Sequence, residues 1–274
     1  MKETEIVIYN QNIWGCTRGD DIIANRCRLI SELADYHDAD IISFQECSKE
    51  ARDIADGNIC ELLAPSYEEV KHDAVGNNFT PIFYKSERFD VIESGYILYE
   101  RQRPTNSKSI TFALFNEKES NIKFAVLSAH FWWRAGTLED EEVRFYNAQL
   151  LSKKACELKK KYDVPVFLMG DFNCGNGSAA GMIPYLYLKE KFLDIREIAP
   201  ISTEEHTHHE SPKINEIGEY TANERRDAES TLDHIFVTEH RNVAIDSFEV
   251  DTSDEAYASS DHFPLIARAR IFGD

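Results

Sequence analysis

The feature that most constrains the fold is a strand–helix–strand pattern that occurs twice in this 274-residue chain. It covers residues 5–13, 20–36 and 40–44 in the first copy, and 122–127, 139–162 and 164–169 in the second. The first helical segment repeats apolar side chains on one face, at Ile23, Cys27, Ile30 and Ala34. The second does so at Val143, Tyr146, Leu150, Leu151, Ala155, Leu158 and Tyr162. Such a unit favours two parallel neighbouring strands joined by a crossover helix.

Further apolar runs predict additional strands around these two units. They cover residues 81–84, 89–99 and 109–115, and then 232–238, 243–250 and 264–271 after a loop-rich stretch at 200–230. No Pro/Gly/Ser-rich linker divides the sequence. We therefore expect an α/β fold in which two packed mixed sheets are flanked by helices, as a single domain over residues 1–274.

Composition limits the classes of partner. The chain has 49 acidic and 30 basic residues, a net charge of −19. Tight non-specific binding of nucleic acid rests on basic side chains, so we expect no stable nucleic-acid complex, although a nuclease is not excluded. No apolar run approaches the ~18 residues of a membrane-spanning helix, and no signal segment is visible, so a soluble cytoplasmic protein is expected. Six cysteines without a Cys-x-x-Cys pair predict free, mostly buried thiols.

Polar residues interrupt or follow the apolar runs in both halves of the chain. They are Asn12, Glu46, His130, Asp171, Asn173, Asp233, Asp261 and His262. Because ligands of α/β sheets bind at the carboxyl ends of strands, we expect the first five at one rim. Carboxylate and amide oxygens suit Mg²⁺ or Mn²⁺, and a histidine beside an aspartate serves as a general acid or base. The pattern predicts metal-assisted attack of water on a phosphoester.

In this order the motifs resemble the endonuclease/exonuclease/phosphatase superfamily of metal-dependent phosphoesterases. The markers are Asn12, Phe44-Gln45-Glu46, Gly170-Asp171-Phe172-Asn173, Leu232-Asp233-His234-Ile235-Phe236 and Ser260-Asp261-His262. The resemblance covers nearly the whole chain and implies a deoxyribonuclease-like fold, a four-layer α/β sandwich.

The resemblance also implies a metal site. Glu46 would be the main Mg²⁺ ligand, with Mn²⁺ as an alternative ion, and Asn12 and Asp261 would lie near the same ion. Some members of the superfamily carry an acidic residue two positions after the asparagine, where this chain has Trp14. The number of metal ions therefore stays open.

The catalytic roles follow from the same resemblance. Asp171 would activate or orient the attacking water, and Asn173 would hold a phosphate oxygen. His262, paired with Asp233, would act as an acid or base or as a clamp on the phosphate. His130 occupies the position of a residue that stabilises or protonates the leaving group.

Residues beside these motifs are candidates for binding the substrate. Trp132, Trp133 and Arg134 follow His130 closely, and they can stack on a base or sugar and hold a phosphate. The alternative is that one tryptophan is core and the arginine is solvated. Asn78 is a further candidate, with a turn as its alternative role.

Three other features have plainer interpretations. The histidine-rich run at 206–209 has a spacing unsuited to a tetrahedral zinc site, so a substrate-facing loop with one useful histidine is expected. Lys108, with Arg101 and Arg103, is interpreted as part of a charged loop. Cys47 and Cys174 stand beside motif residues and are interpreted as bystanders.

The sequence thus predicts a monomeric Mg²⁺- or Mn²⁺-dependent hydrolase that cleaves a phosphoester, with a phosphodiester favoured. The substrate is left open among phosphorylated small molecules, nucleotides and nucleic acids. The alternatives are a phosphomonoesterase acting on a small phosphorylated metabolite and a non-catalytic binding domain of the same fold. The signature of inositol-polyphosphate phosphatases, Pro-Ala-Trp-Thr-Asp-Arg, is absent, which disfavours that substrate class.

Overall fold

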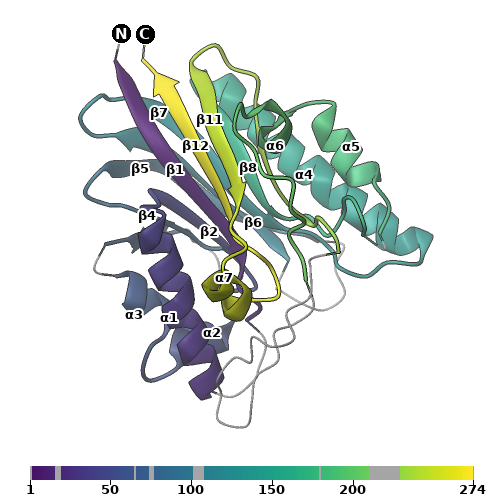
Figure 1. Cartoon of the computed structure of the whole chain (residues 1–274). Coiled ribbons are helices and arrows are strands. Elements are labelled where there is room, and N and C mark those ends of the chain that lie inside the picture. Colours follow the sequence, from purple (N-terminus) through teal and green to yellow (C-terminus); the bar gives the residue numbers. More distant parts are fainter. Residues whose placement is uncertain are drawn as a thin grey trace.

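Two mixed β-sheets form the centre of the molecule, with helices on either side of them (Figure 1). The structure is a computed structural model that describes residues 2–15, 20–64, 66–73, 77–100, 108–178, 180–209 and 229–273. Each sheet has six strands within these ranges. The predicted arrangement of two packed sheets flanked by helices is confirmed.

The first sheet contains the first strand–helix–strand unit. Its strand order is β11-β12-β1-β2-β4-β3. The strands are β1 (Glu3–Asn12), β2 (Ile41–Gln45), β3 (Glu68–Glu69), β4 (Ile82–Tyr84), β11 (Val243–Val250) and β12 (Leu265–Phe272). Strands β1 and β2 are parallel, and the helix α1 (Asp20–Tyr36) connects them. The apolar face predicted for α1 is buried as expected.

The second sheet contains the second unit. Its strand order is β5-β6-β7-β8-β10-β9. The strands are β5 (Phe89–Leu98), β6 (Ser109–Glu117), β7 (Lys123–His130), β8 (Val166–Asp171), β9 (Leu193–Asp194) and β10 (Asp233–Val237). Strands β7 and β8 are parallel, and the long helix α4 (Leu138–Tyr162) joins them and packs on both.

The remaining helices are short and were not predicted from the sequence. They are α2 (Lys49–Asp53), α3 (Ile59–Leu63), α5 (Ile183–Lys189), α6 (Ile195–Ile198) and α7 (Asp254–Ser259). Helices α2, α3 and α7 pack against α1, whereas α5 packs against α4 (Figure 1). Helices of this length span one to two turns, too few for an apolar repeat to identify them. Within the described ranges, no helix is long and apolar enough to cross a membrane.

The buried face of α4 differs from the predicted one. Its buried residues are Arg144, Asn147, Ala148, Leu151, Ser152, Ala155 and Leu158. Val143, Tyr146, Leu150 and Tyr162, which were predicted on the buried face, are only half-buried. The prediction followed hydrophobicity alone, whereas polar side chains of α4 point inward to bind loop backbone. Leu151, Ala155 and Leu158 were predicted correctly.

A hydrogen-bonded serine pair links the two sheets near the ends of their central strands. The Ser43 hydroxyl in β2 donates to Ser128 Oγ in β7 over 2.8 Å, and the Ser128 hydroxyl lies 3.2 Å from the Phe44 carbonyl oxygen. Strands β1 and β2 pack against β7 and β8 across this interface. The carboxyl ends of these four strands, from two different sheets, therefore meet at one place.

Candidate functional site

A cavity of about 460 Å³ lies where the two sheets meet at these strand ends. Its lining includes six of the motif residues, Glu46, His130, Asp171, Asn173, Asp261 and His262. The other lining residues are Gly15, Ser48, Phe79, Lys108, Trp133, His208 and Leu232. Asn12 and Asp233 stand directly behind this lining, each bonded to one of its members.

Glu46 is presented to the cavity by a strained turn after β2. Its backbone φ of 56° lies in the left-handed region, and its side chain is 35% exposed. The chain passes so close at Gly15 that a Cβ there would lie 1.8 Å from the Glu46 carbonyl oxygen. Only glycine fits at position 15, which explains why the loop after β1 carries it.

Asp171 is the most heavily bonded carboxylate of the cavity. Its Oδ2 accepts hydrogen bonds from Asn12 Nδ2 (2.9 Å) and Asn173 Nδ2 (3.2 Å), and His130 Nε2 lies at 3.1 Å. Its Oδ1 accepts from the Asn173 backbone N–H over 2.9 Å. Burial disfavours the carboxylate, but His130, His262 and Lys108 together hold the pKa of Asp171 well below its usual range. Asp171 is therefore an ionised acceptor, suited to orienting a water molecule.

Asn12 holds Asp171 in place. Its amide nitrogen donates to Asp171, as described, and its amide oxygen accepts from the Trp14 backbone N–H over 3.0 Å. Both bonds lie inside the protein, and Asn12 is not among the residues lining the cavity. Its role as a metal ligand stays a prediction.

Lys108 and His130 form a buried pair on one wall of the cavity. Lys108 Nζ contacts both ring nitrogens of His130, and its distance to Nδ1 is 3.0 Å. Burial lowers the pKa of Lys108 to about 8, against the raising influence of Glu46 and Asp171. Burial and the Lys108 charge lower the pKa of His130. A neutral His130 that donates from Nε2 to Asp171 and accepts from Lys108 at Nδ1 fits this arrangement.

Asp233 fixes the orientation of His262 on the opposite wall. His262 Nδ1 lies 2.8 Å from Asp233 Oδ2. The Thr207 hydroxyl donates to the same Oδ2 over 2.7 Å, because its own oxygen accepts from the backbone N–H groups of Leu232 and Asp233. Asp233 Oδ2 is thus an acceptor on both sides, so His262 carries a proton on Nδ1 and turns Nε2 to the cavity. Burial opposes the charged ring, but Asp233, Asp171 and Asp261 raise the pKa of His262 to about 10.

The cavity suits a divalent cation. Glu46 and Asp261 both present carboxylates to it. Burial raises the pKa of Asp261 to about 6, and the Glu46 charge acts in the same direction while His262 opposes it. Two mutually repelling carboxylates at the mouth of a cavity are stabilised by a cation between them. Oxygen ligands of this kind are those preferred by Mg²⁺ and Mn²⁺.

The candidate substrate-binding residues are not equivalent in the structure. Trp133 is exposed and lines the cavity, and the Arg134 guanidinium stacks over its ring at 5.3 Å. Trp132 is buried and its indole N–H donates to Asp140 over 2.8 Å, which secures the start of α4. Asn78 is also buried, and its amide oxygen caps the backbone N–H of Thr80.

Arg144 braces the loops that carry site residues, and it was missed in the sequence. This fully buried guanidinium donates to the backbone carbonyls of Arg134, over 2.7 and 3.0 Å, and of Asn173, over 3.1 Å. It also pairs with Glu141 in the same helix at 3.2 Å. Its helical spacing from Ala148 and Leu151 was the available signal, because an arginine on a buried face is a charge that needs partners.

Lys108 and Thr207 were not assigned to the site from the sequence either. Lys108 was interpreted as part of a charged loop, but it is buried in the cavity wall. Arg101 and Arg103 of that loop lie outside the described residues. The expected useful histidine of the 206–209 run corresponds to His208, which lines the cavity.

The described cysteines are free, and Cys16 lies outside the described residues. Cys27, Cys47 and Cys174 are buried, whereas Cys60 is half-buried and Cys156 is exposed. Burial raises the pKa of the Cys47 and Cys174 thiols. Neither is ionised near neutral pH, which agrees with the interpretation that they are bystanders.

Comparison with known proteins identifies relatives of this architecture. Residues 10–262 match the model of the Endonuclease/Exonuclease/phosphatase family. No curated protein sequence gives a significant match. Among solved structures, an endonuclease/exonuclease/phosphatase family protein from Bacteroides thetaiotaomicron is 21% identical with a TM-score of 0.74, and all of each chain is covered.

Two further structural neighbours have named activities or ligands. A mannosyl-6-phosphatase from Bacteroides thetaiotaomicron is 22% identical with a TM-score of 0.72, covering 97% of this chain and 100% of that one. TDP2 from D. rerio, complexed with a single-stranded DNA product, is 15% identical with a TM-score of 0.67, covering 97% and 99% of the two chains. At these identities the likeness demonstrates a shared fold.

Proposed function

Because the chain belongs to the endonuclease/exonuclease/phosphatase family, we propose that it is a metal-dependent hydrolase of phosphoesters, with a phosphodiester as the favoured substrate. One observation carries the proposal. One cavity at the strand ends of both sheets is lined by three carboxylates and two imidazoles. They belong to Glu46, Asp171, Asp261, His130 and His262. This combination supplies a cation site, an acceptor for water and proton-bearing groups within one volume.

Glu46 and Asp261 are the residues proposed to hold the cation, with Asn12 behind them. A bound Mg²⁺ or Mn²⁺ would neutralise phosphate charge and act as a Lewis acid. Asp171 orients the attacking water through Oδ1, since its Oδ2 already faces three donor groups. Asn173 donates its side-chain amide to Asp171 Oδ2 and to the Phe131 carbonyl, both over 3.2 Å, and it would exchange one of these bonds for a phosphate oxygen.

The two histidines work from opposite walls. His262 donates from Nε2 to the phosphate, because Asp233 holds the proton on Nδ1 and keeps the ring charged. On the other wall, Lys108 donates to the leaving oxygen, and His130, bonded to Asp171 and to Lys108, holds the ammonium in place for that role. Lys108 also supplies a positive charge that an acidic protein needs in order to hold an anionic substrate.

The structural neighbours support two substrate classes. The mannosyl-6-phosphatase supports a phosphorylated sugar, and TDP2 with its single-stranded DNA product supports DNA. Exposed Trp133 with Arg134 stacked on it supports a substrate with a flat or ring-shaped group beside its phosphate. The alternative of a phosphomonoesterase acting on a phosphorylated metabolite fits the same contacts. A non-catalytic binding domain is the remaining alternative.

The test is hydrolysis of bis(p-nitrophenyl) phosphate beside p-nitrophenyl phosphate, with Mg²⁺, Mn²⁺ or EDTA. We expect the wild-type protein to cleave the diester with either metal and to lose that activity in EDTA. Glu46→Gln should lower the rate at least ~100-fold, because it removes the charge that attracts the ion. Exposed Glu157→Gln on α4 is the matched control and should retain full activity.

Cleavage of the monoester alone would show that the protein is a phosphomonoesterase and would contradict the proposed diesterase activity. Diester cleavage that survives EDTA, or that is unchanged in Glu46→Gln, would contradict the proposed metal site. If neither ester is turned over, nucleotides, single-stranded DNA and hexose 6-phosphates are the next substrates. Inactivity towards all of them, with the ion still bound, would favour the binding domain.

Lys108 provides a second test of the same cavity. We expect Lys108→Met to lower kcat/KM about 100-fold, because it removes a buried donor aimed at developing negative charge. Lys108→Arg should restore part of the activity, since it retains the charge. Exposed Lys153→Met serves as the control for loss of a lysine. Full activity of Lys108→Met would show that the ammonium has only a structural role.

A further inference from the structure

His208 and His262 face each other because the backbone places them opposite one another. They form an antiparallel bridge between the segment that follows α6 and the segment that follows α7. Two backbone hydrogen bonds flank the bridge, from His209 N to the Asp261 carbonyl (3.0 Å) and from Phe263 N to the Thr207 carbonyl (2.8 Å). Bridged residues direct their side chains to the same side of the pair. The two rings consequently lie with their centroids 4.8 Å apart.

Each ring has one nitrogen engaged by a neighbouring oxygen and one turned towards the cavity. His262 uses Nδ1 to bind Asp233, as described above. His208 has its Nδ1 3.2 Å from Ser230 Oγ. A second bridge, from His208 to Ser230, holds the His208 backbone from its other side. The Nε2 atoms are therefore positioned before any ligand arrives.

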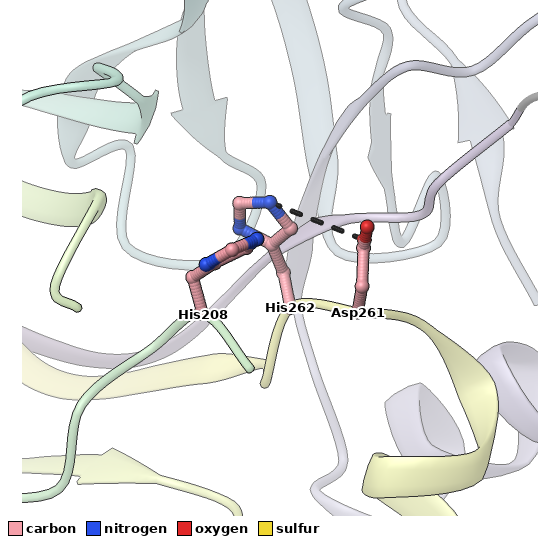
Figure 2. Close-up of side chains that lie close together, drawn as sticks. All are labelled: His208, Asp261 and His262. Carbon is pink, nitrogen blue, oxygen red and sulfur yellow. Dashed lines mark ion pairs between the residues drawn. The ribbon is translucent and has the colours of Figure 1, made fainter. Parts of the chain in front are cut away.

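The carboxylate of Asp261 completes a group of three. Its Oδ1 lies 4.0 Å from His262 Nε2, and one ligand atom from each of the three residues lies within 4.8 Å of the others. Figure 2 shows the His208 and His262 rings side by side, with the Asp261 carboxylate facing His262. A zinc ion binds its ligand atoms at about 2.0–2.2 Å, so the three atoms would lie closer to one another than 4.8 Å when the ion is bound. Small rotations of the side chains bring the atoms to that separation.

We propose that His208, Asp261 and His262 form a binding site for a divalent transition-metal ion, with Zn²⁺ as the ion it prefers over Mg²⁺. Two imidazole nitrogens and one carboxylate oxygen are borderline ligands that suit zinc, whereas magnesium takes oxygen ligands. A histidine that binds metal through one nitrogen and a carboxylate through the other, as His262 does with Asp233, is a recurrent arrangement around zinc. The histidine run at 206–209 contributes only one ligand, and the others come from a distant part of the sequence.

The site has a consequence that rests on the proposed function. His262 Nε2 is the atom proposed to donate to the phosphate, and a bound zinc ion would release the proton of that nitrogen to solvent and take the lone pair it leaves. Asp261 is also one of the proposed magnesium ligands. Zn²⁺ is therefore an inhibitor that removes a phosphate donor and competes with Mg²⁺ for a shared carboxylate.

Binding is tested without reference to turnover, by calorimetric titration of ZnCl₂ into the metal-free protein. We expect His208→Ala to weaken the binding of zinc at least ~10-fold. His206→Ala, two residues away, is the matched control and should bind as the wild type does. Glu46→Gln should also retain zinc binding, because Glu46 belongs to the proposed magnesium site alone. Co²⁺ provides a spectroscopic reading, since its visible absorption distinguishes a nitrogen-containing site from an all-oxygen site.

Zinc affinity equal to that of the wild type in both His208→Ala and His208→Asn would overturn the proposal. The proposal would also be overturned if Glu46→Gln lost zinc binding while His208→Ala retained it. The inhibitory arm compares diester hydrolysis at saturating Mg²⁺ with added Zn²⁺, and inhibition should need at least ~10-fold more zinc in His208→Ala. Zinc binding through His208 in a protein without esterase activity would uphold the metal site and reject the proposed function. Equal inhibition of both proteins would reject the inhibitory role.

Discussion

Asp171→Asn is expected to reduce phosphoester hydrolysis by at least ~10³-fold while the protein remains folded. The substitution keeps the size of the side chain but removes the charge that orients the water. It also disturbs an ordered set of bonds, because Oδ2 faces Asn12 Nδ2, Asn173 Nδ2 and His130 Nε2. An amide at this position either turns its own N–H groups towards these donors or gives them a weaker acceptor. The measurement is kcat with bis(p-nitrophenyl) phosphate at saturating Mg²⁺.

Asp163→Asn is the matched control for this substitution. Asp163 ends α4 with a left-handed φ of 51°, which asparagine adopts readily, and it precedes the start of β8, whereas Asp171 stands at the opposite end of that strand. Its activity should stay within about twofold of the wild type. Equal thermal melting of the wild type and Asp171→Asn, together with unchanged kcat, would remove Asp171 from the mechanism.

The sequence predicted which side chains gather at one rim, because strand ends are local features. Asp171 ends β8 and Asn173 follows it closely, and Glu46 follows β2 in the other half of the chain. Parallel pairing of β1 with β2 and of β7 with β8 then brings these ends together. How the two sheets face each other depends on side-chain packing. The two copies of the strand–helix–strand unit nevertheless predicted two sheets that pack together.

The remaining parts of the site depend on loops and on side-chain direction. Lys108 precedes β6 in a charged stretch, and no periodicity indicates that its ammonium turns inward. Thr207 donates its O–H to Asp233 because its oxygen accepts from backbone N–H groups of a distant segment. Arg144 is polar, so the apolar repeat that predicts the buried face of α4 does not include it. Each of these residues is recognised by its partners, which a single sequence does not display.

The pairing of Asp233 with His262 leads to the second large effect. We expect Asp233→Asn to lower kcat about 10²- to 10³-fold, because the ring loses the acceptor that holds its proton on Nδ1 and keeps it charged. The same change should reduce the free energy of unfolding by about 3 kcal/mol, since it removes one partner of a buried ion pair. Both quantities are measurable on one preparation, the second by urea unfolding of metal-free protein.

The loss of stability should depend on pH in a definite direction. In the metal-free protein the pKa of His262 is raised to about 10, whereas an unperturbed histidine titrates near ~6.5. A raised pKa contributes stability that is fully present below ~6.5 and is lost as pH rises through about 10. The difference in unfolding free energy between wild type and Asp233→Asn should therefore be largest near pH ~6.5 and shrink towards pH ~10.

Asp246→Asn distinguishes this behaviour from the loss of any ion pair. Asp246 pairs with Arg270 at the surface, where the two side chains are 37% and 39% exposed. Removing an exposed partner should cost at most about 1 kcal/mol, with no change in kcat. A difference between wild type and Asp233→Asn that stays constant across this pH range would mean that His262 is uncharged in the folded protein. His262 would then act on the phosphate as a neutral donor.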